Sequence, residues 1–454
     1  MNDVLLVLLS IFFITGIGYA IIWGFSLLDE KNNLSTISYA FGLGVGFIAM
    51  QLYWYARFNI SWNILLLFSP WMFVMLIILI KNRQKLNLYF PTIERLRKID
   101  YILLILIGLT GCYVFFEALL RPVSVWDGLA IWMYKSKMFF IDGTIRADHL
   151  NFIDPGYPLI ISLLGTFVYL VLGHVNDTAV LLTSFAFYAF LSLLFFSVLK
   201  KKYGITYALI FTFLMITTQN FIRHGGRMQA GQADLPLGYY SFVSVLLLFE
   251  YIKKNKTKIL LLLSIFLGIT GLIKVEGIPF TAVIVFFAIY HAYQRKLFHH
   301  IVILLIWILP LADWEVYKRV NYIATSYFSA HPIQFTIHKS VNAMYGTIRE
   351  LINIKSWNML WIVYFYSLLV VNTKKNKELF IINIVILSQI VVYIFIYLLT
   401  SENSPQSSIE RLLTHIAPLA FYYLALITYP LRNQLLTKYK KNTKVKKWYQ
   451  FLIS

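Results

Sequence analysis

Apolar runs of roughly 20 residues recur along the chain and alternate with short polar or basic segments. Each run is long enough to cross a hydrocarbon core of about 30 Å as a helix. Lipid gives the backbone no hydrogen-bond partners, so spanning segments are helices or closed barrels. Barrel strands would alternate apolar and polar residues, and these runs do not. The pattern therefore predicts an all-α polytopic membrane protein.

The hydropathy pattern predicts about thirteen spans in one domain covering residues 1–454, with no internal repeat. The expected parts are N-terminal spans in 1–100, a large loop with surface-lying helices in 119–177, further spans in 178–430 and a basic tail, 431–454. The expected spans are 4–28, 37–55, 62–80, 101–120, 178–199, 204–221, 237–252, 259–273, 279–293, 301–317, 358–371, 379–399 and 413–430.

The short apolar run Pro158–Gly173 decides the orientation of everything after it. If it crossed the membrane, the cluster Lys200-Lys201-Lys202 would lie outside, against the positive-inside rule. We therefore expect this run to lie along the membrane surface. Every lysine-rich cluster then falls on the cytoplasmic side, together with the C-terminus. The N-terminus and the acidic candidates described below fall on the outer side.

Composition supports the membrane assignment and excludes a nucleic-acid partner. The chain is 59% hydrophobic and only 13% charged, whereas soluble domains carry about 25% charged residues. The net charge of +20 comes mostly from clusters between spans, where the positive-inside rule places them. The richness in Ile, Lys, Asn and Tyr is typical of an AT-rich bacterial genome, so we expect a multi-pass protein of a bacterial plasma membrane.

The first candidate for chemistry is Asp127, in the loop that follows the fourth span. A carboxylate at a membrane boundary is a functional candidate, and the alternative is a solvated acid beside the interfacial Trp126. Arg121 precedes it, and Lys135 follows. If Gly128–Phe140 forms a short amphipathic helix, Asp127 lies near its N-cap, where carboxylates are favoured.

The second candidate is Asp234, at the expected start of a span. Its alternative role is an ordinary helix N-cap. Three cationic or titratable residues lie just upstream, namely Arg223, His224 and Arg227. Cations beside an acid suit an anionic phosphate held close to a base.

Two further charged positions interrupt apolar segments. Lys274 and Glu276 occupy the turn between two apolar helices, where charges are costly if buried. Arg411 follows Glu410 and precedes His415 at the expected outer start of the last span. Arg411 is a candidate phosphate ligand, and the alternative is an arginine that snorkels at the interface.

This layout resembles the GT-C superfamily of polyprenyl-phosphate-dependent glycosyltransferases, and in particular the protein O-mannosyltransferases and the lipid A aminoarabinose transferases. The resemblance rests on an acid in the first large outer loop (Asp127), a following membrane-parallel helix preceded by Asp154-Pro155-Gly156-Tyr157, and a second acid two spans later (Asp234). The turn Lys274–Gly277 is also similar. The resemblance covers Arg121–Gly277, and four spans precede the first acidic loop where the family typically has one.

The resemblance implies an inverting transfer of a sugar from a polyprenyl-phosphate donor to a glycan, lipid or protein acceptor. Asp127 would be the general base. Cations among Arg121, Arg227, Lys274 and Arg411 would neutralise the departing phosphate. Asp234 and Glu276 would orient the sugar, the acceptor or a cation-binding partner. The other substrate-binding candidates are Arg121, Lys135, Tyr157, Arg223, His224, Arg227, Lys274 and Arg411. Some members of the family need a divalent cation, which leaves that alternative open, but the sequence shows no clear oxygen cage, so we expect no metal and no other cofactor.

Two other functions remain open at this stage. An envelope polysaccharide polymerase or ligase would use the same lipid-linked donors, but it would favour Arg and His over acids in its outer loops. A lipid or solute transporter would place charges near the bilayer midplane and often show repeats. The charges here gather at one face instead, and this favours the glycosyltransferase.

Overall fold

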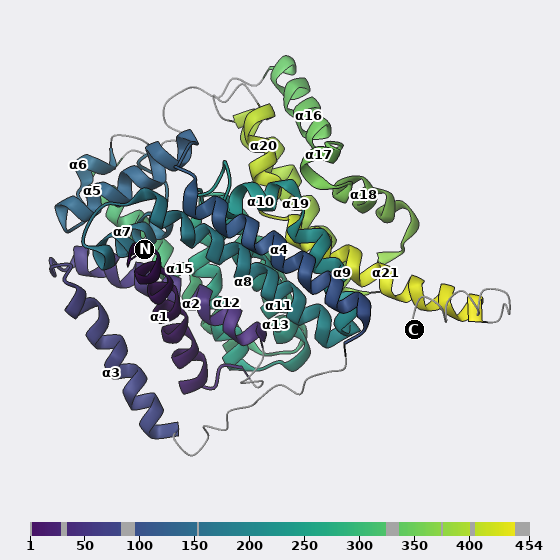
Figure 1. The fold of residues 1–454 in the computed structure, drawn as a ribbon, viewed down its shortest axis with the longest axis horizontal. Helices are drawn as coiled ribbons and strands as arrows, with labels where there is room; N and C mark the ends of the chain where they lie inside the picture. The colour runs from purple at the N-terminus through teal and green to yellow at the C-terminus, as the bar shows by residue number, and fades with distance from the viewer. Residues whose placement is uncertain are drawn as a thin grey trace.

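The computed structural model describes residues 2–28, 34–82, 96–151, 154–323, 336–373, 376–399 and 405–440, and these form helices and connecting turns without strands. The prediction of an all-α polytopic fold is confirmed. The helices pack into one bundle, with α3 (Ile64–Asn82) apart at one corner and the helices from α16 (Ile337–Leu351) to α18 (Leu360–Val370) along another edge (Figure 1).

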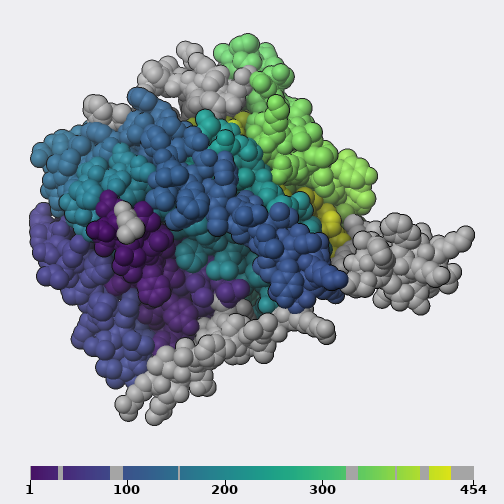
Figure 2. All heavy atoms as spheres, in the orientation of Figure 1, coloured from purple at the N-terminus to yellow at the C-terminus, as the bar shows by residue number. Residues whose placement is uncertain are grey.

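Nine helical segments in the described residues are long and apolar enough to cross a membrane. They are α1 (Asn2–Gly24), α2 (Leu34–Arg57), α3 (Ile64–Asn82), α4 (Lys98–Leu120), α8 (Asp177–Tyr203), α11 (Asp234–Lys254), α13 (Gly277–Gln294), α14–η3–α15 (Phe298–Val320) and α19 (Lys377–Leu399). The exposed side chains of α3 and α4 are largely apolar, and Figure 2 shows α4 lying on the surface of the bundle. Such faces are suited to contact with lipid.

Two further spans are broken. Helices α9 (Ile205–Ile216) and α10 (Gln219–Gly225) meet at 72°, and α20 (Pro405–Thr414) meets α21 (Ala417–Lys440) at 51°. Counting each bent pair as one span gives up to eleven in the described residues, so the predicted count of thirteen is not confirmed.

The difference comes from two expected spans that form shorter helices. Helix α12 (Thr257–Ile273) has 17 residues, and α18 (Leu360–Val370) has 11. At 1.5 Å per residue, α18 extends only about 17 Å, well below the thickness of the hydrocarbon core. Helix α12 is almost entirely buried between α11, α13 and α15, so protein rather than lipid surrounds it.

Short helices cover the end of the bundle near Asp127. They are η2 (Gly128–Met133), α5 (Tyr134–Asp142), α6 (Ala147–Leu150) and α7 (Ile160–Leu172). Two other helices, α16 (Ile337–Leu351) and α17 (Ile354–Trp357), lie elsewhere. Helix α7 has 13 residues, too few to cross a membrane, as expected for Pro158–Gly173. It packs against α1, α2 and α5. Its orientation in the membrane stays a prediction.

Glycine contacts bring α1 and α2 unusually close. A β-carbon on Gly18 would lie 1.9 Å from the carbonyl oxygen of Ala40, and one on Gly44 would lie 1.9 Å from that of Ile14. Small residues allow backbones to approach in this way in membrane helices. The α1–α2 pair packs against α7 and α8.

We therefore expect Gly44→Ala to lower the free energy of unfolding by about 1–3 kcal/mol, because the added methyl group overpacks the crossing. The measurement is denaturation of the purified protein in detergent micelles. Gly108→Ala is the matched control, since a β-carbon at Gly108 on α4 has no neighbour within 4 Å. Equal stability of the two variants would contradict the close contact.

Candidate active site

Asp127 begins the helical segment that follows the loop after α4. The first turns, Gly128–Met133, are a π-helix, and α5 continues from Tyr134. The segment considered as a short helix in the sequence is therefore helical, with a π start. Asp127 makes no side-chain capping bond. Its carboxylate forms an ion pair with Arg411 instead, and 28% of the Asp127 side chain is exposed. A π-turn at this position is typical of a functional site.

The bend between α20 and α21 delivers the partner of Asp127. Arg411 lies in the last turn of α20, and His415 occupies the break before α21. The two are four residues apart and point to the same side of the bundle, since both interact with Asp234. The bend thus places a guanidinium and an imidazole against one acid.

The second group of charges lies where three helices meet. Asp234 is the first residue of α11, Lys274 ends α12 and Glu276 precedes α13. Lys274 Nζ is 2.9 Å from Asp234 Oδ1 and 3.2 Å from Glu276 Oε1. His415 Nε2 is also 2.9 Å from Asp234 Oδ1. All four side chains are buried, and mutual pairing offsets the high cost of burying them.

Asp234 therefore differs from the simple N-cap that was the alternative at the sequence level. The N-cap position belongs to Ala233, and the Asp234 carboxylate is used by Lys274 and His415. The phenol of Tyr393 extends the network, lying 3.3 Å from the other ring nitrogen of His415. The charged turn between α12 and α13 is thus part of one buried polar network.

Arg411 joins the two groups, because it interacts electrostatically with both Asp127 and Asp234. The structure therefore brings together three acids and two cations from distant parts of the sequence. We call this set the charge network: Asp127, Asp234, Lys274, Glu276 and Arg411.

Two predicted residues on α10 lie beside the charge network. Arg223 forms an ion pair with Glu410, the neighbour of Arg411. His224 is buried close enough to Asp234 and Arg411 to interact with both electrostatically. Neither ring nitrogen of His224 has a hydrogen-bond partner among the described residues. Buried polar atoms are rarely left unpaired, so this imidazole is suited to bind a polar ligand.

Lys135 and Tyr157 shape the loop before α7. Lys135 Nζ donates a hydrogen bond of 2.7 Å to the carbonyl oxygen of Asp154 and lies 6.0 Å from the centre of the Tyr157 ring. Burial lowers the pKa of Lys135 to about 7, and the charge of Asp154 opposes this shift. Tyr157 also interacts electrostatically with Arg411. Lys135 thus supports the loop that holds Tyr157 near the network.

Arg121 and Arg227 form a separate group at the end of α4. Arg121 Nε is 2.6 Å from Glu117 Oε2, and Arg227 Nε is 4.0 Å from the same atom. The structure pairs both predicted cations with this acid, and it pairs neither with Asp127. Sequence reasoning missed Glu117, although its spacing of four residues from Arg121 is a detectable helical pair. It also missed Tyr393, which no signal separates from the other 30 tyrosines.

In the described part of the chain, no three His, Cys, Asp or Glu side chains group in a way that could hold a metal ion. The acids of the charge network are instead bonded to cationic side chains: Asp234 and Glu276 to Lys274, and Asp127 to Arg411. Charge compensation in this network comes from Lys and Arg.

Part of the chain matches a known protein family. The family model described as dolichyl-phosphate-mannose-protein mannosyltransferase matches residues 156–314, about a third of the chain. No curated protein and no solved structure matches the chain. The matched segment begins after Asp127, later than the expected start at Arg121, and it extends past Gly277.

The matched segment supplies much of the candidate site. It contains Tyr157, Arg223, His224, Arg227, Asp234, Lys274 and Glu276. Asp127 and Arg411 lie outside it and pair with each other, and Arg411 interacts electrostatically with Asp234 inside it. Residues 156–314 are thus similar to the dolichyl-phosphate-mannose-protein mannosyltransferases, which confirms the predicted resemblance and supports a membrane glycosyltransferase of the GT-C type.

Proposed function

We propose that this protein transfers a sugar from a polyprenyl-phosphate donor to a hydroxyl group of a cell-envelope acceptor, with inversion at the anomeric carbon. The observation that carries the proposal is the charge network, in which a partly exposed carboxylate, Asp127, is paired with Arg411, and Arg411 also lies near Asp234, the partner of the buried Lys274. Base and phosphate ligand are the two functions that such a transfer needs.

In the proposed reaction, the acceptor oxygen forms a bond to the anomeric carbon as the bond from that carbon to the phosphate oxygen breaks. The acceptor proton passes to the Asp127 carboxylate. The donor is a phosphodiester with one negative charge, and it leaves as a phosphomonoester with one more. Cations that strengthen their contact as this charge develops stabilise the transition state more than the ground state.

The geometry favours Asp127 over Asp234 as the base. Asp234 is about 1% exposed, and one of its oxygens already accepts from Lys274 and His415. Asp127 is more exposed and is bonded to Arg411. We assign proton transfer to Asp127, phosphate binding to Arg411 and Lys274 with Arg223 nearby, and orientation of the substrates to Asp234 and Glu276.

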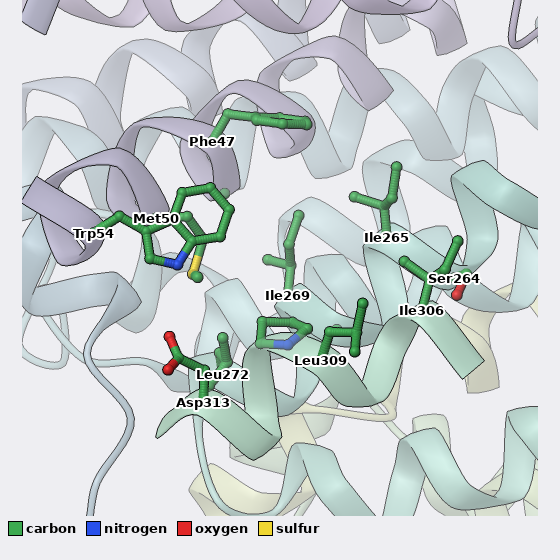
Figure 3. Close-up of a pocket in the computed structure, with 13 residues that line it drawn as sticks. Phe47, Met50, Trp54, Ser264, Ile265, Ile269, Leu272, Ile306, Leu309 and Asp313 are labelled. Carbon is green, nitrogen blue, oxygen red and sulfur yellow. The ribbon is translucent and has the colours of Figure 1, made fainter. Parts of the chain in front are cut away.

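A lipid-linked donor also needs a place for its hydrocarbon chain. A cavity of about 410 Å³ lies between α2, α12 and the η3–α15 segment, within the size range of ligand pockets. Its lining is almost entirely apolar, with Trp54 and Asp313 on one side and Ile265 and Ile306 on the other (Figure 3).

Residues that line this cavity and its neighbour are close in sequence to two residues of the candidate site. Leu272 lines it two residues before Lys274. A narrow neighbouring pocket shares Met50, Leu272 and Pro310 with it and reaches Leu159, two residues after Tyr157. We propose that an isoprenoid chain lies in this cavity with its phosphate end toward the network.

We expect Met50→Trp to raise the KM for a long-chain polyprenyl-phosphate donor several-fold with little change in kcat, because the indole fills apolar volume that the lipid chain occupies. The measurement is initial rate against donor concentration in detergent micelles. Met72→Trp on α3 is the matched control, since Met72 is 57% exposed and does not line the cavity. An unchanged KM in both variants would exclude the cavity as the chain site.

The proposal is tested directly by transfer of radiolabelled sugar from a polyprenyl-phosphate donor to envelope acceptors in membranes that carry the protein. Transfer that depends on the protein, with inverted stereochemistry in the product, would support it. Transfer of preassembled glycans instead of single sugars would favour a polymerase or ligase. Absence of transfer from any lipid-linked donor would overturn the proposal.

The proposal also includes the side of the membrane on which transfer takes place and its independence of metal ions. We propose that the network faces the outer side of the plasma membrane, with the basic C-terminal segment in the cytoplasm, as the distribution of lysine clusters favours. Part of that segment, 441–454, and the basic residues of 83–95 lie outside the described residues. We also propose that transfer needs no metal ion, because Arg411 and Lys274 supply positive charge at the site. Retained activity in a strong chelator would support this.

A further inference from the structure

The assigned base is occupied in the structure. Asp127 Oδ2 forms an ion pair with Arg411, so this oxygen is not free to take the proton of an acceptor hydroxyl. The side chains are partly exposed, 28% for Asp127 and 17% for Arg411. The pair can therefore separate without leaving either charge fully buried.

Arg411 has capacity for another anionic ligand. A guanidinium carries five N–H donors in a fixed fork that matches phosphate oxygens. The Nε of Arg411 is buried and has no hydrogen-bond partner among the described residues. Arg411 also lies in the field of Asp234, so two acids hold it at the site. A buried, unpaired donor of this kind is suited to receive a phosphate oxygen.

We propose that the donor phosphate takes Arg411 from Asp127, so that binding of the lipid-linked donor releases the base. This inference rests on the proposed function and adds an order to it. The donor binds first, Arg411 turns to the phosphate, and Asp127 then accepts the proton of the acceptor hydroxyl. An acceptor that arrives without a donor finds the base engaged.

The charge balance of the reaction supports both the transfer of Arg411 to the phosphate and its return to Asp127. During transfer the phosphate gains one negative charge and Asp127 becomes neutral by protonation, so Arg411 is held more strongly by the phosphate. After the phosphomonoester leaves and Asp127 loses its proton, the carboxylate pairs with Arg411 again. The same guanidinium thus stabilises the leaving group and resets the base.

The test is binding of farnesyl phosphate to the purified protein in detergent, measured by calorimetry. If Arg411 must leave Asp127 to bind phosphate, then Asp127→Asn removes the competitor, and we expect roughly fivefold tighter binding. Farnesol, which lacks the phosphate, should bind the variant and the wild type equally. A gain in affinity from loss of a site residue is not what a structural role for Asp127 would produce.

Asp177→Asn is the matched control variant. Asp177 is 23% exposed and pairs with Lys137, so its replacement removes the same charge without touching Arg411. We expect unchanged affinity for farnesyl phosphate. If Asp177→Asn tightens binding as much as Asp127→Asn, the effect is one of overall charge, and the exchange is overturned.

A double-mutant cycle assigns the effect to Arg411. In an Arg411→Gln background, Asp127→Asn should give no gain in affinity. The sign of the Asp127→Asn effect alone decides the proposal if Arg411→Gln does not fold. If the wild type transfers sugar but Asp127→Asn binds farnesyl phosphate no more tightly than the wild type, the exchange is overturned and the proposed function stands. A wild type that neither transfers sugar nor binds farnesyl phosphate would overturn both.

Discussion

Asp127→Asn should reduce sugar transfer by roughly 10²–10⁴-fold, the usual contribution of a positioned general base. Asparagine keeps the size of the side chain but cannot accept the acceptor proton. The measurement is kcat for transfer from a polyprenyl-phosphate donor, at a protein level matched to the wild type. If the same variant also binds farnesyl phosphate more tightly, the loss of kcat comes from proton transfer and not from weaker binding of the donor.

The control for this prediction is Asp148→Asn. Asp148 is an exposed acid on α6 that pairs with Arg146, and its side chain is 59% exposed. We expect transfer close to that of the wild type. If Asp127→Asn retains full activity while Asp234→Asn loses it, the base is Asp234, and our assignment of the two acids is reversed.

Lys274→Met should lower the free energy of unfolding by about 3–5 kcal/mol, because it leaves two buried carboxylates without their cation. Lys274 bonds both Asp234 and Glu276, and all three side chains are at most 7% exposed. The measurement is chemical denaturation in detergent micelles. Adding Glu276→Gln to Lys274→Met should recover part of the loss, since one buried charge then disappears.

Arg146→Gln provides the comparison for Lys274→Met. It breaks the exposed ion pair with Asp148, and such surface pairs contribute only about 0–1 kcal/mol. A stability loss in Lys274→Met no larger than in Arg146→Gln would mean that water reaches the charges at the α11–α12–α13 junction. The charges of the network would then be hydrated in spite of their burial.

The sequence predicts well those features that depend on neighbouring residues. Long apolar runs give the helices, and the charged interruption at Lys274 and Glu276 marks a real junction. Asp234 does begin a helix. In each case the signal lies within a few residues, because hydropathy and helix-end preferences are local properties.

The features that were missed depend on distant parts of the chain. Asp127 and Arg411 are 284 residues apart, and Asp234 and His415 are 181 apart. No local pattern states which acid meets which cation. The bend between α9 and α10 was also invisible, because a bent helix pair and a straight span have the same hydropathy. The span count differs from the predicted one because two of the expected spans, α12 and α18, are apolar but short helices.

The position of α20 near the end of the chain has a consequence for biosynthesis. Asp127 and Asp234 are synthesised long before Arg411 and His415, and their helices enter the membrane first. Until α20 is in place, Asp127 lacks its partner and Asp234 is held by Lys274 without His415. Unpaired charge in a membrane is costly, so insertion of α20 both completes the site and removes that cost. The charge network is then completed late in membrane integration, and in a nascent chain Asp127 is not yet held by Arg411.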